Sequence, residues 1–338
     1  MFKRWLFYRN LPAWMEDDHP MMKRELQRGY HRQRITNHWL RRVRWLSLVA
    51  SALMLGIIGY TVMGMLRQDN PNMPFSQQVY SWQLVPLYII HFLLFMGAFS
   101  LGLNTIHDQK RINTWEKIRV TSDGIRLIMW TRWAYLTFHH NALLLTVVYA
   151  VRVVMIGALL YDLTAFGGNY LRYLLLQSTP AVPHGLGVVL VGANITAGLL
   201  LPLSMLSLTS ALSLLASTYF TQPILIWFAK ITFTAVYFLI ATALMLLVTS
   251  LYMETVYEGN SILAHQNIGI GGWFAAVGVT VYADWGASLL YLGFLGEHVW
   301  VNIPYGIWIG VGVLAVVMAQ VILAEICLRI AVYRAERA

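Results

Sequence analysis

The fold is decided by a charged stretch that separates two long apolar runs. Residues 107–124 read HDQKRINTWEKIRVTSDG. Asn113 can cap a helix that starts there, with Glu116 in the capping-box position three residues later. A second cap is offered by three consecutive polar residues, Thr121, Ser122 and Asp123. We therefore expect residues 105–138 to form a rigid elbow of two capped helices on the water side of a membrane, with an ordinary polar loop as the alternative.

The composition around this elbow is that of a membrane protein. Hydrophobic residues make up 58% of the chain and charged residues 12%, against about 25% charged in soluble domains. Runs of about 20 apolar residues span a bilayer, and six are expected here, at 45–66, 81–104, 139–161, 184–213, 222–252 and 304–328. Polar loops are expected at 67–80 and 162–183. We predict an all-α polytopic membrane protein with one domain over residues 45–338.

Residues 1–44 precede the first expected span and are predicted to lie at the membrane surface. Residues 15–44 combine an apolar stripe with many lysines and arginines, which is typical of a basic amphipathic helix in the interface. Residues 1–14 lack the long apolar run of a cleavable signal peptide. The single cysteine, Cys327, excludes a disulfide within one chain.

The basic residues predict which side of the membrane each segment faces. Of the 24 lysines and arginines, eleven precede the first expected span, six lie in the elbow and three follow the last span. The expected outer loops hold only Arg67 and Arg172. By the positive-inside rule, both termini and the elbow are cytoplasmic, so the number of full spans is even. The net charge of +9 is therefore assigned to span ends and not to nucleic-acid binding.

The even number of spans also decides how residues 253–303 are interpreted. No lysine or arginine occurs between Lys230 and Arg329, and one more full span would place the basic C-terminus outside. We expect two half-length helices that enter the outer leaflet and return, with a break near Asp284. Two extra full spans would need more residues than 268–303 supplies.

Two motifs in this layout resemble the ABC-2-type permeases, the membrane subunits of ATP-driven exporters. Residues 111–121 contain a basic residue, then Thr-Trp-Glu, an apolar pair and a Thr five residues after the Glu, which is similar to the cytoplasmic coupling helix of that family. The family pattern has Gly before the first Thr and Pro after the later one, where this chain has Asn113 and Ser122. Residues 19–26, HPMMKREL, resemble the N-terminal entry of the family. Short outer helices before the last span also belong to it.

The resemblance implies that the elbow presses into a groove on a separate ATPase subunit. Glu116 would pair with a basic group there and Trp115 would fill an apolar notch, in keeping with the aromatic anchors of interfaces. A purely local cap is the alternative for Glu116. The residues assigned to coupling are Asn113, Thr114, Trp115, Glu116, Arg119, Thr121 and Glu25.

The chain itself is not expected to be an enzyme. An ATPase needs a phosphate-binding loop that ends in Gly-Lys-Ser or Gly-Lys-Thr, and no Gly is followed by Lys here. The resemblance therefore places ATP and Mg²⁺ in the partner subunit. It also implies a second permease chain, in a homodimer or heterodimer, in a cell inner or plasma membrane.

Ionisable groups within spans are functional candidates, and three polar residues share one expected depth. Arg152, His91 and Asn194 lie roughly 15–20 Å from the ends of their spans at 1.5 Å per residue. They either line a polar translocation path, or Arg152 is satisfied by backbone carbonyls and Asn194. Lys230 and Glu325 lie nearer the cytoplasmic side, and a structural role is favoured for both.

Other functional classes fit the sequence less well. A haem subunit needs two histidines at one depth, but His139 and His140 lie at the water boundary while His91 is deep. Scattered acidic and histidine residues predict no metal site. The hydroxyl-rich segment 204–218 is interpreted as a dimer face or a helix–helix face. The remaining alternative to a permease is an accessory or structural subunit of a larger membrane complex, such as an electron-transfer complex, without transport of its own.

Overall fold

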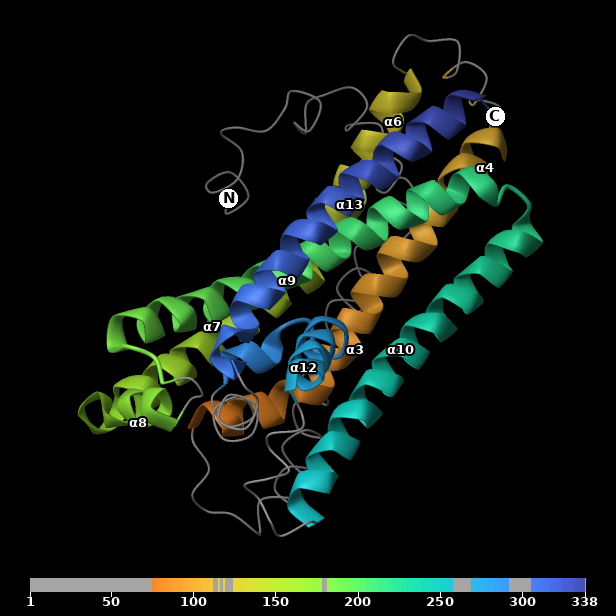
Figure 1. Cartoon of the computed structure of the whole chain (residues 1–338). Helices are drawn as coiled ribbons and strands as arrows, with labels where there is room; N and C mark the ends of the chain where they lie inside the picture. The colour runs from red at the N-terminus through yellow and green to blue at the C-terminus, as the bar shows by residue number, and fades with distance from the viewer. Residues whose placement is uncertain are drawn as a thin grey trace, which may run out of the picture.

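Long apolar helices make up most of the described chain. The computed structural model describes residues 75–111, 124–177, 181–257, 269–291 and 305–337, with Trp115 and Ile118, and no strand occurs among them. Five helices are long and apolar enough to cross a bilayer: α3 (Phe75–Leu103), α7 (Ala142–Thr164), α9 (His184–Tyr219), α10 (Pro223–Tyr257) and α13 (Ile309–Arg337) (Figure 1). Helices satisfy their own backbone groups, which lipid cannot do. The predicted all-α membrane protein is thus confirmed, while the expected span at 45–66 and the surface segment 1–44 lie outside the described residues.

Several predicted boundaries differ from the structure. The helix expected from residue 81 already begins at Phe75, and the region expected to be a loop at 162–183 contains the 3₁₀ turn η6 (Ala165–Gly168) and the helix α8 (Asn169–Gln177). In α8, Leu174 and Leu175 are buried while Tyr173 and Leu176 are exposed. One apolar side is enough to hold a short helix against its neighbours, even where Gly and Pro flank it.

The helices α9 and α13 run side by side through the molecule (Figure 1). A Cβ atom on Gly310 of α13 would lie only 2.8 Å from the Cα of Asn194 on α9, so the two backbones approach closely. Further along, the Ser204 hydroxyl donates to Oε1 of Gln320 at 2.7 Å. The buried hydroxyl stripe of α9 is therefore a helix–helix face within this chain, one of the two readings of segment 204–218.

The helix α9 is longer than a bilayer requires. Its 36 residues extend about 54 Å, against a hydrocarbon core of about 30 Å. One end of α9 and of α13 therefore projects beyond the core. There α9 meets α4 (Thr105–Arg111) and α6 (Gly124–Ala134), and α13 meets α6. A short link, residues 220–222, then leads into α10.

The elbow helix α6 begins directly after the polar triplet at 121–123, where the sequence predicts a helix start. It continues through a π-helical turn, η5 (Tyr135–His140), and Asn141 into α7. The elbow and the span that follows it are therefore nearly continuous, so movement of one acts directly on the other.

The region before the last span contains a broken apolar helix. α12 (Gly269–Tyr282) is too short to cross the bilayer, and after Ala283–Gly286 the chain forms a 3₁₀ turn, η7 (Ala287–Leu290). The predicted break near Asp284 is therefore present. The second half-helix expected here falls mainly on residues 292–304, outside the described residues, and the chain resumes at Tyr305 with the 3₁₀ turn η9 (Gly306–Trp308) that leads into α13.

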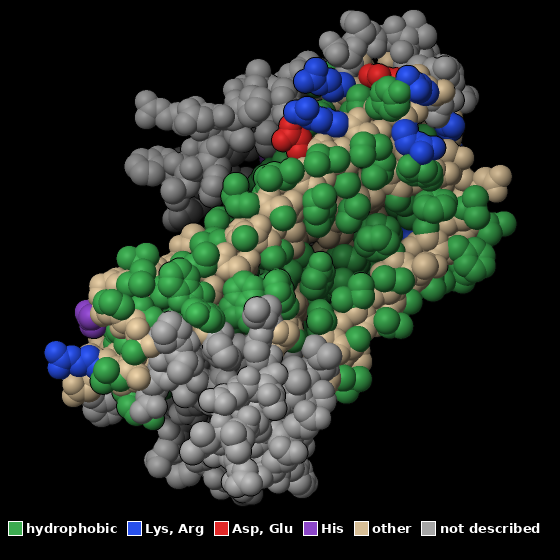
Figure 2. Space-filling model, viewed as in Figure 1, with side chains coloured by type: hydrophobic (Ala, Val, Ile, Leu, Met, Phe, Trp, Pro, Cys, Tyr) green, Lys and Arg blue, Asp and Glu red, His purple; other side chains and the backbone are tan. Residues whose placement is uncertain are grey.

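The charged side chains on the visible face lie mainly at one end of the molecule. Figure 2 shows lysines and arginines gathered at the end that holds α4, α6 and the C-terminus of α13, and one basic side chain at the far end. The exposed basic residues of the first end are Lys110, Arg111, Arg126, Arg329, Arg334 and Arg337, and Arg172 on α8 belongs to the other. Hydrophobic side chains cover much of the described surface between these two ends (Figure 2).

Candidate functional site

A buried polar cluster forms where α12 breaks. Trp285 and Gly286 adopt the left-handed backbone conformation, with φ of 53° and 85°, which turns the chain from α12 into η7. That conformation is costly for a side chain as large as Trp, so neighbouring groups must stabilise it. We call residues 283–286 the corner.

Asp284 fixes the corner from within. Its Oδ1 atom accepts the Gly286 amide at 3.0 Å, and its Oδ2 atom accepts the Ser288 amide at 2.8 Å. The hydroxyl of Tyr80 on α3 donates to the same Oδ2 at 3.0 Å. The Tyr80 ring also stacks on Tyr291, with centroids 4.1 Å apart. The carboxylate is thus held by three donors, although it is only 9% exposed.

Trp285 is held from three different spans. Arg152 on α7 donates from Nη2 to the Trp285 carbonyl at 2.6 Å. The indole N–H donates to the Tyr237 hydroxyl on α10 at 2.8 Å, and that hydroxyl donates to the Tyr282 carbonyl at 3.1 Å. His91 on α3 stacks on the indole, with centroids 4.6 Å apart. The corner therefore ties α3, α7 and α10 to the broken helix.

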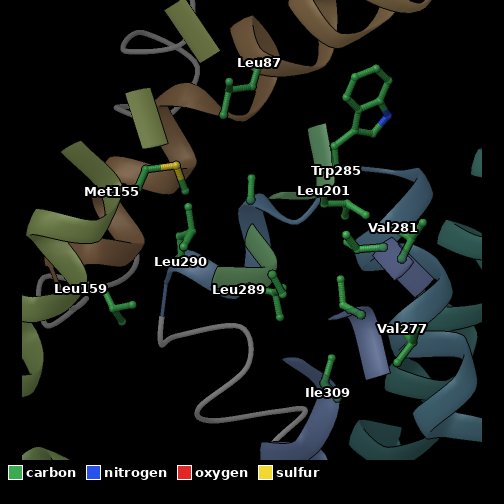
Figure 3. Packing of buried hydrophobic residues seen from close by; sticks show 14 of the residues in the cluster. Leu87, Met155, Leu159, Leu201, Val277, Val281, Trp285, Leu289, Leu290 and Ile309 are labelled. Atoms are coloured by element: carbon green, nitrogen blue, oxygen red, sulfur yellow. The ribbon is translucent and has the colours of Figure 1, made fainter. Parts of the chain in front are cut away.

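Apolar packing completes the corner on its other sides. Figure 3 shows Leu290 of η7 facing Met155 on α7, while Leu289 points toward the side where Val277 and Ile309 lie. On α9, Gly198 comes so close to the corner that an added Cβ would lie 3.1 Å from the Gly286 carbonyl oxygen. The corner is consequently a meeting point of most of the described spans.

The cluster buries two opposite charges without a direct hydrogen bond between them. Arg152 is fully buried, and Asp284 interacts with it through space. Burying an isolated charge costs several kcal/mol, and an opposite charge nearby offsets part of that cost. Because the oxygens of Asp284 already accept from Gly286, Ser288 and Tyr80, Arg152 contributes to the cluster by charge and through the Trp285 carbonyl.

Each of the three predicted path residues has buried hydrogen-bonding groups without a partner. Nε and Nη1 of Arg152, both ring nitrogens of His91 and both amide atoms of Asn194 have no hydrogen-bond partner in the described part of the chain. Each unsatisfied buried group costs about 1–3 kcal/mol. Such groups are rare in native structures, and within a membrane they mark functional candidates.

The structure brings together two of the three predicted path residues. Arg152 and His91 both contact Trp285, whereas Asn194 packs against Gly310 at the crossing of α9 and α13. The sequence alternative to a path was that backbone carbonyls and Asn194 satisfy Arg152. A backbone carbonyl does so in part, but Asn194 does not. Whether these residues line a path stays a prediction.

Trp115 is the one coupling residue that the structure describes. It is helical, 3% exposed, and lies in an apolar cluster with residues of α4, α6, α9 and α13. The ring thus packs inside this chain and not on the surface, where a direct anchor for a partner would lie. The other residues assigned to coupling lie outside the described residues: Asn113, Thr114, Glu116, Arg119, Thr121 and Glu25.

Trp285, Tyr80 and Tyr237 were not singled out by the sequence. A positive φ at a Trp has no local sequence signature. The tripeptide Asp284-Trp285-Gly286 within an apolar run was the one local sign of a tight turn at this place.

No group of His, Cys, Asp or Glu suited to a metal occurs in the described ranges.

Comparison with known proteins does not assign the chain to a family. The sequence matches no family model, and neither a curated protein nor a solved structure is significantly similar to it.

Proposed function

We propose that the chain is a permease subunit of an ATP-driven exporter of the ABC-2 type, working with a separate ATPase subunit. The observation that carries the proposal is the packing of the elbow. Trp115 and Ile118 lie in one apolar cluster with Leu214 of α9 and Leu328 of α13, at the projecting ends of these helices. A segment attached in this way transmits a displacement at the membrane surface to the spans, since packed interiors move as rigid units.

The layout of the described chain supports the same proposal. A broken, Gly-rich apolar helix precedes the last span, and a buried polar cluster lies at its break. Non-helical backbone at membrane depth is tolerated where protein buries it, and it is common in transporters. The motifs at 19–26 and 111–121 add the resemblance to ABC-2 permeases.

In this proposal the chain supplies the moving path and its partner supplies the energy. ATP and Mg²⁺ bind to the ATPase subunit, whose closure displaces the elbow. The displacement passes through the Trp115 cluster to α9 and α13. It switches the central path, which lies between two permease chains, from inward to outward access. The basic end with α4, α6 and the C-terminus faces the cytoplasm of a cell inner or plasma membrane, because lysine and arginine favour that side.

Loss of the Glu116 carboxylate should uncouple the two subunits. In vesicles that contain the complete complex, Glu116→Ala should leave assembly intact and reduce ATP-driven transport by about tenfold or more, as truncation of a charged interface residue does. Glu336→Ala, which removes an exposed carboxylate at the same end, is the matched control and should transport normally. Normal transport by the Glu116 variant would refute the coupling role.

A further inference from the structure

Arg152 and His91 offer hydrogen-bonding groups that the described protein does not use. Arg152 is fully buried and donates only from Nη2, and His91 is 2% exposed with neither ring nitrogen bonded among the described residues. Guanidinium carries five N–H donors, and imidazole carries a donor in every protonation state. The two side chains therefore present unused donors in one buried region.

One residue of the corner covers both side chains. The Trp285 carbonyl lies 2.6 Å from Nη2 of Arg152, and the Trp285 ring stacks on His91 with planes 16° apart. Asp284 cannot take the place of the carbonyl without giving up donors, because Gly286, Ser288 and Tyr80 already bind its oxygens. Displacement of Trp285 would therefore uncover Arg152 and His91 together.

At the depth of Arg152 the surrounding lipid offers only acyl chains, which cannot accept a hydrogen bond. Arg152 lies ten residues beyond Ala142 at the start of α7, about 15 Å along the helix axis. The side chains around the corner, among them Leu87, Met155 and Leu290, are apolar (Figure 3). This surrounding suits a molecule with an alkyl part and one polar group.

We propose that Arg152 and His91 form a mid-membrane site for the carboxylate or phosphate of an acidic amphiphile, and that the Trp285 carbonyl occupies this site in the present structure. A carbonyl is a neutral acceptor, whereas an ionised oxygen forms a stronger, charge-assisted hydrogen bond with guanidinium. The left-handed backbone of Trp285 stores strain that is released when the corner moves. An acidic ligand thus replaces the carbonyl once the corner opens.

As a site for transported substrate, this inference rests on the proposed exporter function and names its substrate class. As an anion site, it does not require a partner subunit. The two claims therefore separate experimentally, because binding is measured on the isolated full-length chain and coupling is measured on the complex.

Photolabelling of the full-length chain in phosphatidylcholine nanodiscs tests the site. The probe is palmitic acid with a diazirine on its alkyl chain, and its methyl ester is the uncharged control. The acid should label peptides from α3, α7 or residues 269–291, and excess hexadecyl phosphate should suppress this labelling while hexadecanol does not. The ester should label these peptides weakly. Equal labelling by acid and ester, or no competition by hexadecyl phosphate, would overturn the proposal.

Variants assign the site to Arg152. Arg152→Gln should lower specific labelling about tenfold, the loss expected when a charge-assisted hydrogen bond is removed. Arg172→Gln makes the same change on exposed α8 and should not alter it. Unchanged labelling of the Arg152 variant would refute the assignment. If the Arg152 variant fails to fold, the competition by hexadecyl phosphate in the unaltered protein still tests the anion site.

The source of the acidic group is distinguished by the bilayer. If phosphatidylglycerol in the nanodiscs suppresses labelling, a resident lipid headgroup occupies the site and the transported-acid proposal fails. If labelling persists, it supports a transported acid. Specific labelling, together with a purification from native membranes that recovers no ATPase, would leave the anion site standing and refute its role in export.

Discussion

Asp284 shows how a single acidic residue organises an apolar region. Its two oxygens accept from the Gly286 and Ser288 amides and from the Tyr80 hydroxyl, and its charge offsets that of buried Arg152. Without the carboxylate, two amides and a hydroxyl lose their acceptor and the arginine charge loses its counter-charge. The corner then has little to hold its left-handed backbone.

Replacement of Asp284 should therefore destabilise the fold more than loss of one of its donors. We expect Asp284→Ala to cost about 3–5 kcal/mol, as does removal of one partner from a buried charge pair, and Tyr80→Phe to cost less. Thermal unfolding of the purified protein in detergent measures both. Thr164→Val, on an exposed position, is the control and should change little. Equal unfolding temperatures for the two corner variants would contradict the role of the carboxylate.

Helix geometry predicted that Arg152 and His91 lie near each other, but it did not predict the residue that joins them. The depth of Arg152 and His91 followed from the rise of a helix, and both residues meet at the corner. Their common partner, Trp285, could not be predicted, because its positive φ depends on contacts with three distant spans. Asn194 was predicted to share this depth but packs against Gly310 of α13, since depth does not specify the direction of a side chain.

At the scale of elements, the crossing of α9 and α13 depends on a missing side chain. At Gly310 an added Cβ would lie 1.9 Å from Oδ1 and 2.8 Å from Cα of Asn194. The second contact involves backbone, so rotation of the Asn194 side chain would not relieve it. Small residues permit this kind of close approach between helices in membranes.

A methyl group at Gly310 should therefore separate the two helices. We expect Gly310→Ala to destabilise the protein by about 1–3 kcal/mol or more through overpacking. The matched control is Gly192→Ala on α9, where an added Cβ meets nothing within 4 Å. Thermal unfolding and the yield of monodisperse protein compare the two. A Gly310 variant as stable as the Gly192 variant would refute the close crossing.

The elements themselves were predicted from hydropathy and turn residues with different success. The apolar runs placed the starts of α9 and α10 within one residue, and Asp284 marked the break after α12. The helix α8 was missed because Gly167 and Pro180 suggested a loop, although they only bracket a short helix with one buried side. Local breakers mark ends of elements, but burial against neighbours decides whether a short helix forms between them.

On the scale of the whole molecule, the distribution of charge indicates the orientation of the chain in the membrane. Most basic side chains of the described residues lie at the end with α4, α6 and the C-terminus of α13, while Arg172 lies at the other end (Figure 2). The elbow cluster joins the projecting ends of α9 and α13 at the basic end. The corner lies apart from it, toward the end that we assign to the outer side.

Cysteine labelling should establish this direction. In a Cys327→Ser background, Tyr173→Cys on α8 should react with a membrane-impermeant maleimide in intact cells, and Arg334→Cys on α13 only after permeabilisation. Both positions are exposed, so access depends on the side of the membrane. The Cys327→Ser chain without an added cysteine is the control. The reverse pattern would contradict the assigned orientation and place the elbow outside.

The central claim is that this chain works with a separate ATPase, and purification of the complex tests it most directly. The chain would be isolated from its native membranes in a mild detergent, and the proteins that accompany it would be identified and quantified by mass spectrometry. We predict an ATPase with a Gly-rich phosphate-binding loop in about equal amount, since each permease chain binds one ATPase in this account. Recovery of redox or other membrane subunits without an ATPase would contradict it and identify the chain as an accessory subunit.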